Sequence, residues 1–276
     1  MSVALCTLPT VKALMGIATS DDDARLGILI GAASDAIERD CDRLLAARNI
    51  SEWRDGTGTP DIILPEWPLN SVSRVTIGTL DAITVVNNDP LATEAFARVT
   101  NTTLEVIILD GANAGTDSVT LGTKTIDTVI AEVNALGKGW AGNALSDYGG
   151  YRASTLRRAG RRECYGSFCY FQIPDEGEAD YITEYDTGII HLTGGLFPRG
   201  RQNIYIEYNA GYDPIPGTPQ RICADLVADA YYAHQSAPNK KKEQLGDYMY
   251  ELESRPGWSV TSKDIQHRLA PFKNQL

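Results

Sequence analysis

The stretch of residues 203–235 constrains the fold most, because within it a strand pattern gives way to a helix pattern. Ile204 and Ile206 alternate with Tyr205 and Glu207, which is the period-two pattern of a half-buried β-strand. The pattern stops at an Asn-Ala-Gly sequence, since glycine readily takes the positive φ of a turn. We therefore predict a strand that ends in a tight corner.

The corner is rich in proline and leads into a helix. Pro214, Pro216 and Pro219 keep the connection extended. Thr218 can cap the helix, with Pro219 at its first position, where no backbone N–H is needed. An apolar stripe follows at Ile222, Cys223, Leu226, Val227 and Ala230. These residues predict a scaffold joint rather than a catalytic loop.

The joint also carries a family resemblance. A strand that ends in Tyr-x-Ala-Gly-Tyr (residues 208–212), followed by a proline-rich corner and a helix, resembles the head–tail adaptor (connector) family of tailed bacteriophages. The segments LPEWPLNSVSRVTI (residues 64–77) and DTGIIHLTGGLFPRGRQNIYIEY (residues 186–208) are similar to strands of the same family. The N-terminal helical pair also fits, so the resemblance covers roughly residues 1–80 and 180–255.

The resemblance implies a structural virion protein at the head–tail interface. Members of the family form a ring, commonly dodecameric, that lies beneath the portal protein, extends the DNA channel and provides the platform for neck or tail attachment. The implied partners are the portal protein, a downstream neck, stopper or tail protein, other copies of the chain, and double-stranded DNA that passes without sequence-specific binding.

The combined patterns predict an α+β protein with a small helical bundle core, a β-strand arm and an inserted α+β subdomain. We divide the chain into an adaptor core (residues 1–80 and 180–255), an inserted subdomain with a basic loop (residues 81–179) and a C-terminal docking tail (residues 256–276). Within the insertion we expect strands near residues 95–101, 104–110 and 118–121 and a helix that starts at Thr125.

Two helices are expected at the N-terminus: one over residues 8–17 with Thr7 as its cap, and one from about residue 22 to residue 47 with Ser20 as its cap. The adjacent acids at residues 21–23 lack the spacing of a calcium loop, so favourable charge at a helix N-terminus explains them better than a metal does. The polar face of the longer helix is expected to be solvated or to face another subunit; it carries Arg25, Asp35, Glu38, Arg39, Asp42 and Arg43.

The chain is acidic, with a formal net charge of −11. A protein that grips nucleic acid over its whole surface is normally basic. An acidic surface suits either a channel through which DNA slides or an ordinary solvated protein. The sequence also has no run of about 18 apolar residues, so no membrane partner is expected.

One stretch departs from this acidity. Five arginines lie close together at the end of the insertion, and without them the net charge would fall from −11 to −16. They are Arg152, Arg157, Arg158, Arg161 and Arg162. Three interpretations stay open: a flexible solvated loop, docking on an acidic rim of a partner, or contact with DNA phosphates in the channel.

The C-terminal region is expected to hold a helix, with a stripe of Leu245, Tyr248, Met249 and Leu252, and then a polar tail with spaced apolar anchors. Such a tail suits a segment that orders on binding, although simple terminal fraying is the alternative. We assign portal docking to Trp258, Val260, Ile265, Arg268, Leu269, Phe272 and Lys273.

The five cysteines predict reduced thiols, and therefore assembly in the host cytoplasm before the protein takes its place in the virion neck. Cys164 and Cys169 lack a second Cys or His pair nearby, so we assign them to packing rather than to zinc.

No catalytic or cofactor motif is present, and the three histidines lack a metal-ligand spacing. We predict no enzyme activity, no catalytic residue, no metal and no cofactor. The alternatives to an adaptor are another neck component (a stopper or tail completion protein) and a β-rich carbohydrate-binding or hydrolytic virion protein. Trp53 and Trp67 are expected to anchor a core or interface rather than to form a sugar platform.

Overall fold

The computed structural model describes residues 3–235, 242–245, 248–251 and 263–273, and it confirms a mixed α+β protein. Its helices are α1 (Leu8–Met15), α2 (Asp23–Cys41), α3 (Ile126–Ala135), α4 (Gly217–Gln235) and α5 (Lys263–Leu269), with short 3-10 turns η1 (Tyr148–Gly150), η2 (Ala153–Thr155) and η3 (Ala270–Phe272).

The strands form several small antiparallel sheets. They are β1 (Arg48–Gly56), β2 (Asp61–Ile63), β3 (Leu69–Ile77), β4 (Thr79–Asn87), β5 (Ala95–Val99), β6 (Thr103–Ile108), β7 (Gly115–Thr120), β8 (Trp140–Ala144), β9 (Ala159–Glu163), β10 (Cys169–Pro174), β11 (Tyr181–Glu184), β12 (Ile189–Leu192), β13 (Gly200–Ala210), β14 (Lys242–Leu245) and β15 (Tyr248–Glu251).

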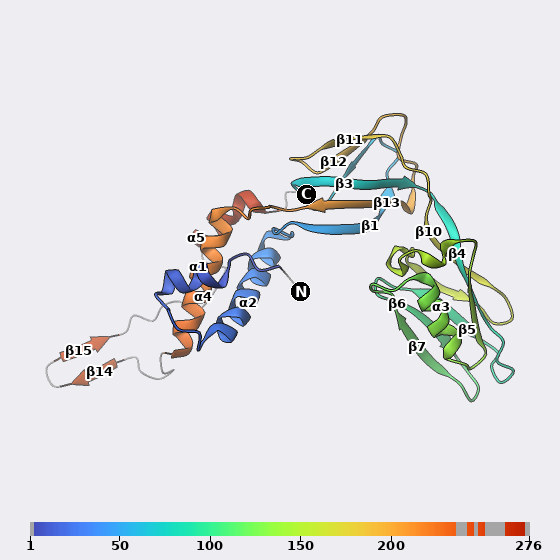
Figure 1. The fold of residues 1–276 in the computed structure, drawn as a ribbon, viewed down its shortest axis with the longest axis horizontal. Helices are drawn as coiled ribbons and strands as arrows, with labels where there is room; N and C mark the ends of the chain where they lie inside the picture. Colours follow the sequence, from blue (N-terminus) through green and yellow to red (C-terminus); the bar gives the residue numbers. More distant parts are fainter. Residues whose placement is uncertain (1–2, 236–241, 246–247, 252–262, 274–276) are drawn as a thin grey trace.

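Helices α1, α2, α4 and α5 share one hydrophobic core at one end of the molecule (Figure 1). Thr7 caps α1 as predicted, since its Oγ1 accepts a hydrogen bond from the Thr10 N–H at 3.3 Å. The predicted cap of α2 is wrong: the N-cap residue is Asp22, and Ser20 contributes its backbone carbonyl, which accepts from the Asp23 N–H.

The predicted C-terminus of α2 is also wrong, because the helix ends at Cys41, six residues earlier than expected. Asp42 takes a left-handed conformation at φ 51°, and the Glu38 carbonyl accepts from the backbone N–H groups of Asp42 and Arg43. Leu44 and Leu45 therefore follow the helix instead of continuing its stripe.

This early end buries two charged residues that were expected on a solvated face, Glu38 and Arg43. The Glu38 Oε1 accepts from the Leu45 N–H at 2.9 Å and from Arg48 Nη2 at 2.6 Å. The Arg43 guanidinium lies 3.6 Å from the ring centre of Trp67 and donates to the Trp67 carbonyl. The two charges are buried because each has a specific partner, which is the usual condition for burial.

Strand β13 is the centre of the long three-stranded sheet β1-β13-β3 that leads away from the helices (Figure 1). It pairs with β1 from Arg48↔Ala210 to Arg54↔Ile204 and with β3 from Leu69↔Ala210 to Ile77↔Ile204. The alternation predicted for residues 203–208 is only partial, because Tyr205 is 2% exposed and buried like its neighbours Ile204 and Ile206.

The corner after β13 requires glycine at position 211. Gly211 has φ +110°, and a side chain there would meet the backbone of Ala46 at 2.7 Å. Helix α4 then begins at Gly217, one residue before the predicted cap Thr218. The Pro216 carbonyl already accepts from the Gln220 N–H, and the Gln220 side chain donates to the Ile215 carbonyl at 2.7 Å, so the turn forms without the threonine.

The chain from β4 to β10 forms a separate hydrophobic cluster at the other end of the long strands (Figure 1). Its strands form the sheets β7-β6-β5-β9 and β10-β4-β8, and α3 packs beside β8. The strands and helix expected between residues 95 and 140 are present, and Thr125 caps α3 as its N-cap.

A narrow connection leads into and out of this region. Strand β3 passes into β4 through Gly78, which has φ +106°, and β10 returns alongside β4. Three further contacts join the region to the long sheet: Arg74 Nη2 to the Asp175 carbonyl at 2.7 Å, Trp53 Nε1 to the Thr155 carbonyl at 3.2 Å, and Arg157 Nη2 to the Arg201 carbonyl at 2.5 Å.

Two further expectations are wrong. The helix predicted around Leu245 and Tyr248 is instead the hairpin β14–β15, with Leu245 opposite Tyr248; Leu252 lies outside the described residues. The spacing of these residues suits a helix, but the Gly-Asp dipeptide between two aromatic or aliphatic runs suits a hairpin equally well. Cys164 and Cys169 form a disulfide rather than a pair of reduced thiols: Cys164 follows β9, Cys169 begins β10, and their Cα atoms lie 5.3 Å apart, within the range of a disulfide.

No helix in the described part of the chain is long and apolar enough to cross a membrane.

We predict that Glu38→Ala lowers the free energy of unfolding by about 3 kcal/mol, because it leaves the Arg48 charge and the buried Leu45 N–H without their partner. Asp35→Ala, on the exposed face of the same helix, is the matched control and should change stability by less than about 0.5 kcal/mol. Urea denaturation measures both. Equal stability of the two variants would contradict a structural role for Glu38.

Candidate interaction surfaces

The basic stretch is only partly a loop. Arg161 and Arg162 lie in β9, which pairs with β5 at the edge of its sheet, with Ala97 opposite Arg162. The interpretation of the whole stretch as a flexible loop does not fit these two residues, because both lie in a strand that is paired with β5. Arg152 precedes the 3-10 turn η2, and Arg157 and Arg158 connect that turn to β9.

Two of the five arginines are occupied within the chain. Arg157 donates from Nη1 to Gln172 Oε1 at 2.9 Å and from Nη2 to the Arg201 carbonyl. Arg162 donates to the Tyr170 carbonyl, and its guanidinium lies 5.3 Å from the ring centre of Phe171. Both residues therefore help to position β9 and β10 and are only half exposed.

The other three arginines are available to a partner. Arg152, Arg158 and Arg161 are exposed, and no hydrogen bond or ion pair within the described part of the chain occupies their side chains. Arg158 and Arg161 border a hollow of about 310 Å³ lined by residues 157–162 and Gln172.

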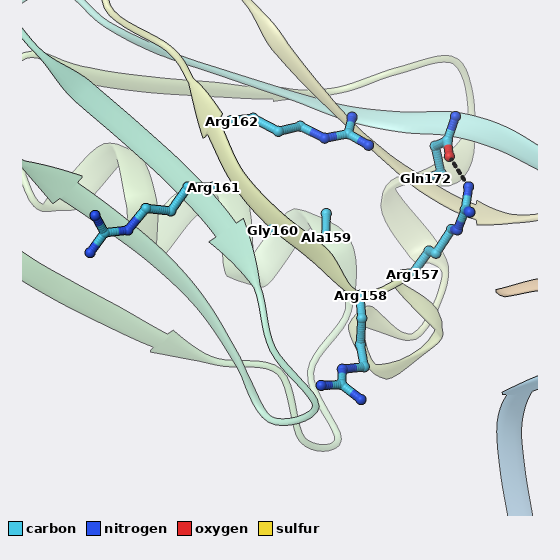
Figure 2. A pocket seen from close by; sticks show the side chains of 7 residues that line it. All are labelled: Arg157, Arg158, Ala159, Gly160, Arg161, Arg162 and Gln172. Carbon is cyan, nitrogen blue, oxygen red and sulfur yellow. Dashed lines mark hydrogen bonds between the residues drawn. The ribbon is translucent and has the colours of Figure 1, made fainter. Parts of the chain in front are cut away.

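The arginines around this hollow do not converge. Figure 2 shows that Arg161 and Arg162 leave opposite sides of β9 and that Arg158 points away from both, while Arg157 is hydrogen-bonded to Gln172. Successive side chains of a strand point to opposite faces, so this divergence follows from the pairing of β9. The arrangement suits an extended acidic surface better than a single phosphate group.

The predicted docking tail folds back on the helical core over its described part. Leu269 is fully buried in the core of α1, α2 and α4, and the partly buried Ile265 and Phe272 pack against the same core. The Phe272 ring lies 6.0 Å from the ring of Tyr212, and Lys273 Nζ lies 3.1 Å from Asp40 Oδ2.

The polar residues of this segment are more accessible. Arg268 lies 3.6 Å from Asp264 in an exposed pair. Trp258 and Val260 lie outside the described residues.

The two tryptophans considered as sugar platforms are engaged within the chain. Trp53 packs against Tyr205, with ring centres 5.1 Å apart, and donates its indole N–H to the Thr155 carbonyl. Trp67 lies under the Arg43 guanidinium. Both are half-buried, in accord with the expectation that they act as anchors.

Sequence reasoning missed a charged cluster on the sheet β11-β12-β2. His191 Nδ1 lies 2.6 Å from Asp61 Oδ1, and His191 Nε2 lies 3.2 Å from Glu184 Oε1. Asp61 and His191 are opposite each other in the strand register although 130 residues separate them, so no local pattern could reveal the pair. Among the described residues, no group of three or more His, Cys, Asp or Glu side chains has the arrangement of a metal site.

The two carboxylates raise the pKa of His191 above its ordinary value of 6.5, with the hydrogen bond to Asp61 as the largest cause. The pKa of Glu184 is lowered, first by the Thr187 hydroxyl and then by His191. Because the histidine pKa is raised on folding, its pairing stabilises the fold fully below the unfolded pKa and is lost as pH rises through the folded pKa.

The N-terminal part of the chain matches a known protein family. The family model described as "Phage gp6-like head-tail connector protein" matches residues 6–83, which span α1, α2, β1–β3 and the start of β4. The predicted resemblance to head–tail connectors is confirmed. A head–tail connector is a structural neck component, and over the matched residues this also confirms the prediction of a non-enzymatic protein.

Among solved structures, the chain is similar to one described as "Neck of empty GTA particle computed with C6 symmetry". The TM-score is 0.41 at 11% sequence identity, over 100% of this chain and 94% of that chain. No curated protein matches the chain.

We predict that Asp61→Asn lowers the titration midpoint of His191, because the largest cause of its raised pKa is removed. Glu184→Gln should lower the midpoint by less. The midpoint is measured from the imidazole carbon-bound proton signals by NMR across the range from about pH 5 to pH 9. A midpoint that is unchanged in Asp61→Asn would show that the pair does not form in solution.

Proposed function

We propose that the chain is a head–tail adaptor whose copies form a dodecameric ring beneath the portal protein of a virion. The ring extends the DNA channel and provides the platform on which the next neck or tail protein is attached. The observation that carries this proposal is the connector family match over residues 6–83. The proposed location is the virion neck, after assembly in the host cytoplasm.

The arrangement of the chain supports a division of labour between its parts. We propose that residues 1–80 and 180–255 form the adaptor core and that residues 81–179 form an inserted subdomain. The helices and the β4–β10 region lie at opposite ends of the long sheet in Figure 1, and the arginines of β9 belong to that second region, so one copy presents chemically different surfaces at separate places. Contacts of this kind, each of modest strength, add up when many copies close a ring.

We further propose that the insertion contacts the next neck protein or an adjacent subunit through Arg152, Arg158 and Arg161. Their exposure and the absence of internal partners among the described residues support this role. Protein docking is favoured over DNA contact because the chain as a whole is acidic, with a net charge of −11. DNA then passes through the ring without being gripped.

We propose that residues 256–276 dock on the portal protein through side chains that are not packed in the helical core. Leu269 belongs to the helical core, so deletion of the whole segment removes core contacts as well as any docking surface. The accessible members, such as Arg268, and Trp258 before α5 are the better candidates for direct contact.

A stopper or tail completion protein is the alternative within the same neck. The carbohydrate-binding alternative would need exposed aromatic rings as a sugar platform. Trp53 and Trp67 do not provide one, because they pack against Tyr205 and Arg43 within the chain.

The proposal predicts that the purified protein co-sediments with DNA-filled heads of its own virus that lack a neck and tail. Negative-stain microscopy should show a collar at the single portal vertex, with less DNA leakage. Arg268→Ala should weaken this binding with little change in the melting temperature, because its pairing with Asp264 is accessible, whereas Leu269→Ala should lower the stability by about 3 kcal/mol. If heads with a competent portal bind none of the wild-type protein, the adaptor function is wrong.

A second prediction addresses the insertion. The double variant Arg158→Glu/Arg161→Glu should fold normally, because both side chains are exposed and unpaired within the described residues, and should still bind heads. It should reduce tail attachment about tenfold, equivalent to about 1.4 kcal/mol, in a complementation assay with virus that lacks the gene.

The matched control is Arg199→Glu/Arg201→Glu, which makes the same charge change at exposed positions near β13. It should support normal tail attachment. Equal loss in both double variants would indicate a general effect of charge rather than a docking role for β9.

A further inference from the structure

Two cysteines that are distant in sequence meet in the helical core. The Sγ atoms of Cys6 and Cys223 lie 3.0 Å apart, although 217 residues separate them. Cys6 lies in the short segment before α1, and Cys223 lies in α4. Both side chains are buried, and both are free thiols.

We propose that Cys6 and Cys223 are a latent disulfide site. They remain thiols in reducing surroundings, and a small disulfide oxidant such as glutathione disulfide joins them into a covalent link between the N-terminal segment and α4. This inference depends on the two sulfur positions and not on the adaptor function.

The surroundings hold the two thiols within reach of each other. The backbone N–H of Leu5, next to Cys6, donates to Ser34 Oγ at 2.9 Å, and Ser34 Oγ donates to the Ile30 carbonyl at 2.7 Å. Ser34 Oγ also lies 3.6 Å from Cys223 Sγ. One serine of α2 therefore fixes the backbone before Cys6 while it contacts the sulfur of Cys223.

Packing restricts the segment further. Leu5 is 1% exposed, and Val11, on the first turns of α1, is fully buried in the same core. Closure of a disulfide needs the sulfur atoms to approach from 3.0 Å to bonding distance, which is about 2.05 Å.

The reaction is thiol–disulfide exchange and balances without another reactant. The Cys6 thiolate attacks one sulfur of glutathione disulfide, a mixed disulfide forms, and one glutathione thiol leaves. The Cys223 thiolate then attacks the Cys6 sulfur, and the second glutathione thiol leaves. The two protons of the cysteine thiols end on the two glutathione thiols.

Oxidation should be slow, because the oxidant must reach buried sulfur. The nearby Val3 is 44% exposed, so the segment before α1 begins at the surface, and its local opening exposes Cys6 at the cost of the contacts that Leu5 and Cys6 make in the core. The hydrogen bond to Cys223 and burial both raise the pKa of Cys6, which keeps it protonated while the segment is closed.

The third free cysteine provides an internal control. Cys41 is buried in the same core, where burial raises its pKa to about 11, and no other cysteine contacts it among the described residues. An oxidant that acts by general unfolding would engage Cys41 as well, whereas the proposed site leaves it free.

The test uses the full-length protein, fully reduced and then incubated with glutathione disulfide. Free thiols are alkylated under denaturing conditions, and a non-reducing digest is analysed by mass spectrometry. We expect a linked Cys6–Cys223 peptide pair, with Cys41 recovered as an alkylated thiol. The melting temperature of the oxidised protein should rise by at least about 3 °C, because the link closes a long loop in the unfolded chain.

Variants separate the link from other effects of oxidation. Cys6→Ser should show no such rise, while Cys41→Ser should keep both the link and the rise. The proposal is overturned if Cys6 and Cys223 are both recovered as free thiols, as separate glutathione adducts or joined to Cys41. The peptide analysis of the wild-type protein decides this even if a variant fails to fold.

Discussion

The pairing of β13 with β1 on one side and β3 on the other is the interaction on which the rest of the structure depends. It brings residues 200–210 beside two strands of residues 48–77, and α2, the β4–β10 region and α4 are connected to the ends of these strands. The close approach of Gly211 to Ala46 then fixes where β13 turns into α4. The backbone N–H of Tyr212 donates to the Leu45 carbonyl, and the Tyr212 carbonyl accepts from the Ala47 N–H. The same corner therefore also fixes the chain after α2. Glu38, at the end of α2, also forms an ion pair with Arg48 at the start of β1. The helices and the long sheet are therefore joined by a partly buried ion pair as well as by apolar packing.

The parts that sequence reasoning predicted well are those whose signals are local. Thr7 was predicted as a helix cap and Thr125 as the start of a helix, because a threonine before an apolar stripe is a local signal of a helix start. Gly211 was predicted to end β13, since a proline-rich corner after an alternating strand leaves few other conformations. The end of α2 was missed for the opposite reason. Its apolar spacing continues through Leu44 and Leu45, and the helix stops because Asp42 turns left-handed and Glu38 finds partners that lie beyond the helix. Such partners are set by tertiary contacts, which a periodic pattern does not contain.

The candidate surfaces show the same limit. The sequence located all five arginines of the basic stretch, but it could not tell which of them are occupied. That division depends on Gln172, Arg201 and Tyr170, residues of β10 and β13 whose positions follow from the sheets. The His191 cluster was missed because it depends on strand register, and the Cys164–Cys169 disulfide because it depends on how the short connection from β9 to β10 folds. The assignment of Leu269 to a docking tail illustrates a further difficulty, because an apolar residue in a polar segment is compatible with a partner's surface or with the chain's own core.

The separate hydrophobic cores of the helices and of the β4–β10 region explain how one chain can serve two kinds of contact. In the proposed adaptor, the surface that contacts the portal and the surface that contacts a neck protein belong to regions with separate cores, so a substitution that affects packing in one region does not disturb packing in the other. Here the connection runs through Gly78 and a few hydrogen bonds, those of Arg74, Trp53 and Arg157, to backbone carbonyls. Carbonyl acceptors are present whatever side chain occupies the position. Three donor side chains and the backbone geometry therefore help to orient the β4–β10 region, and Arg158 and Arg161 take no part in these contacts.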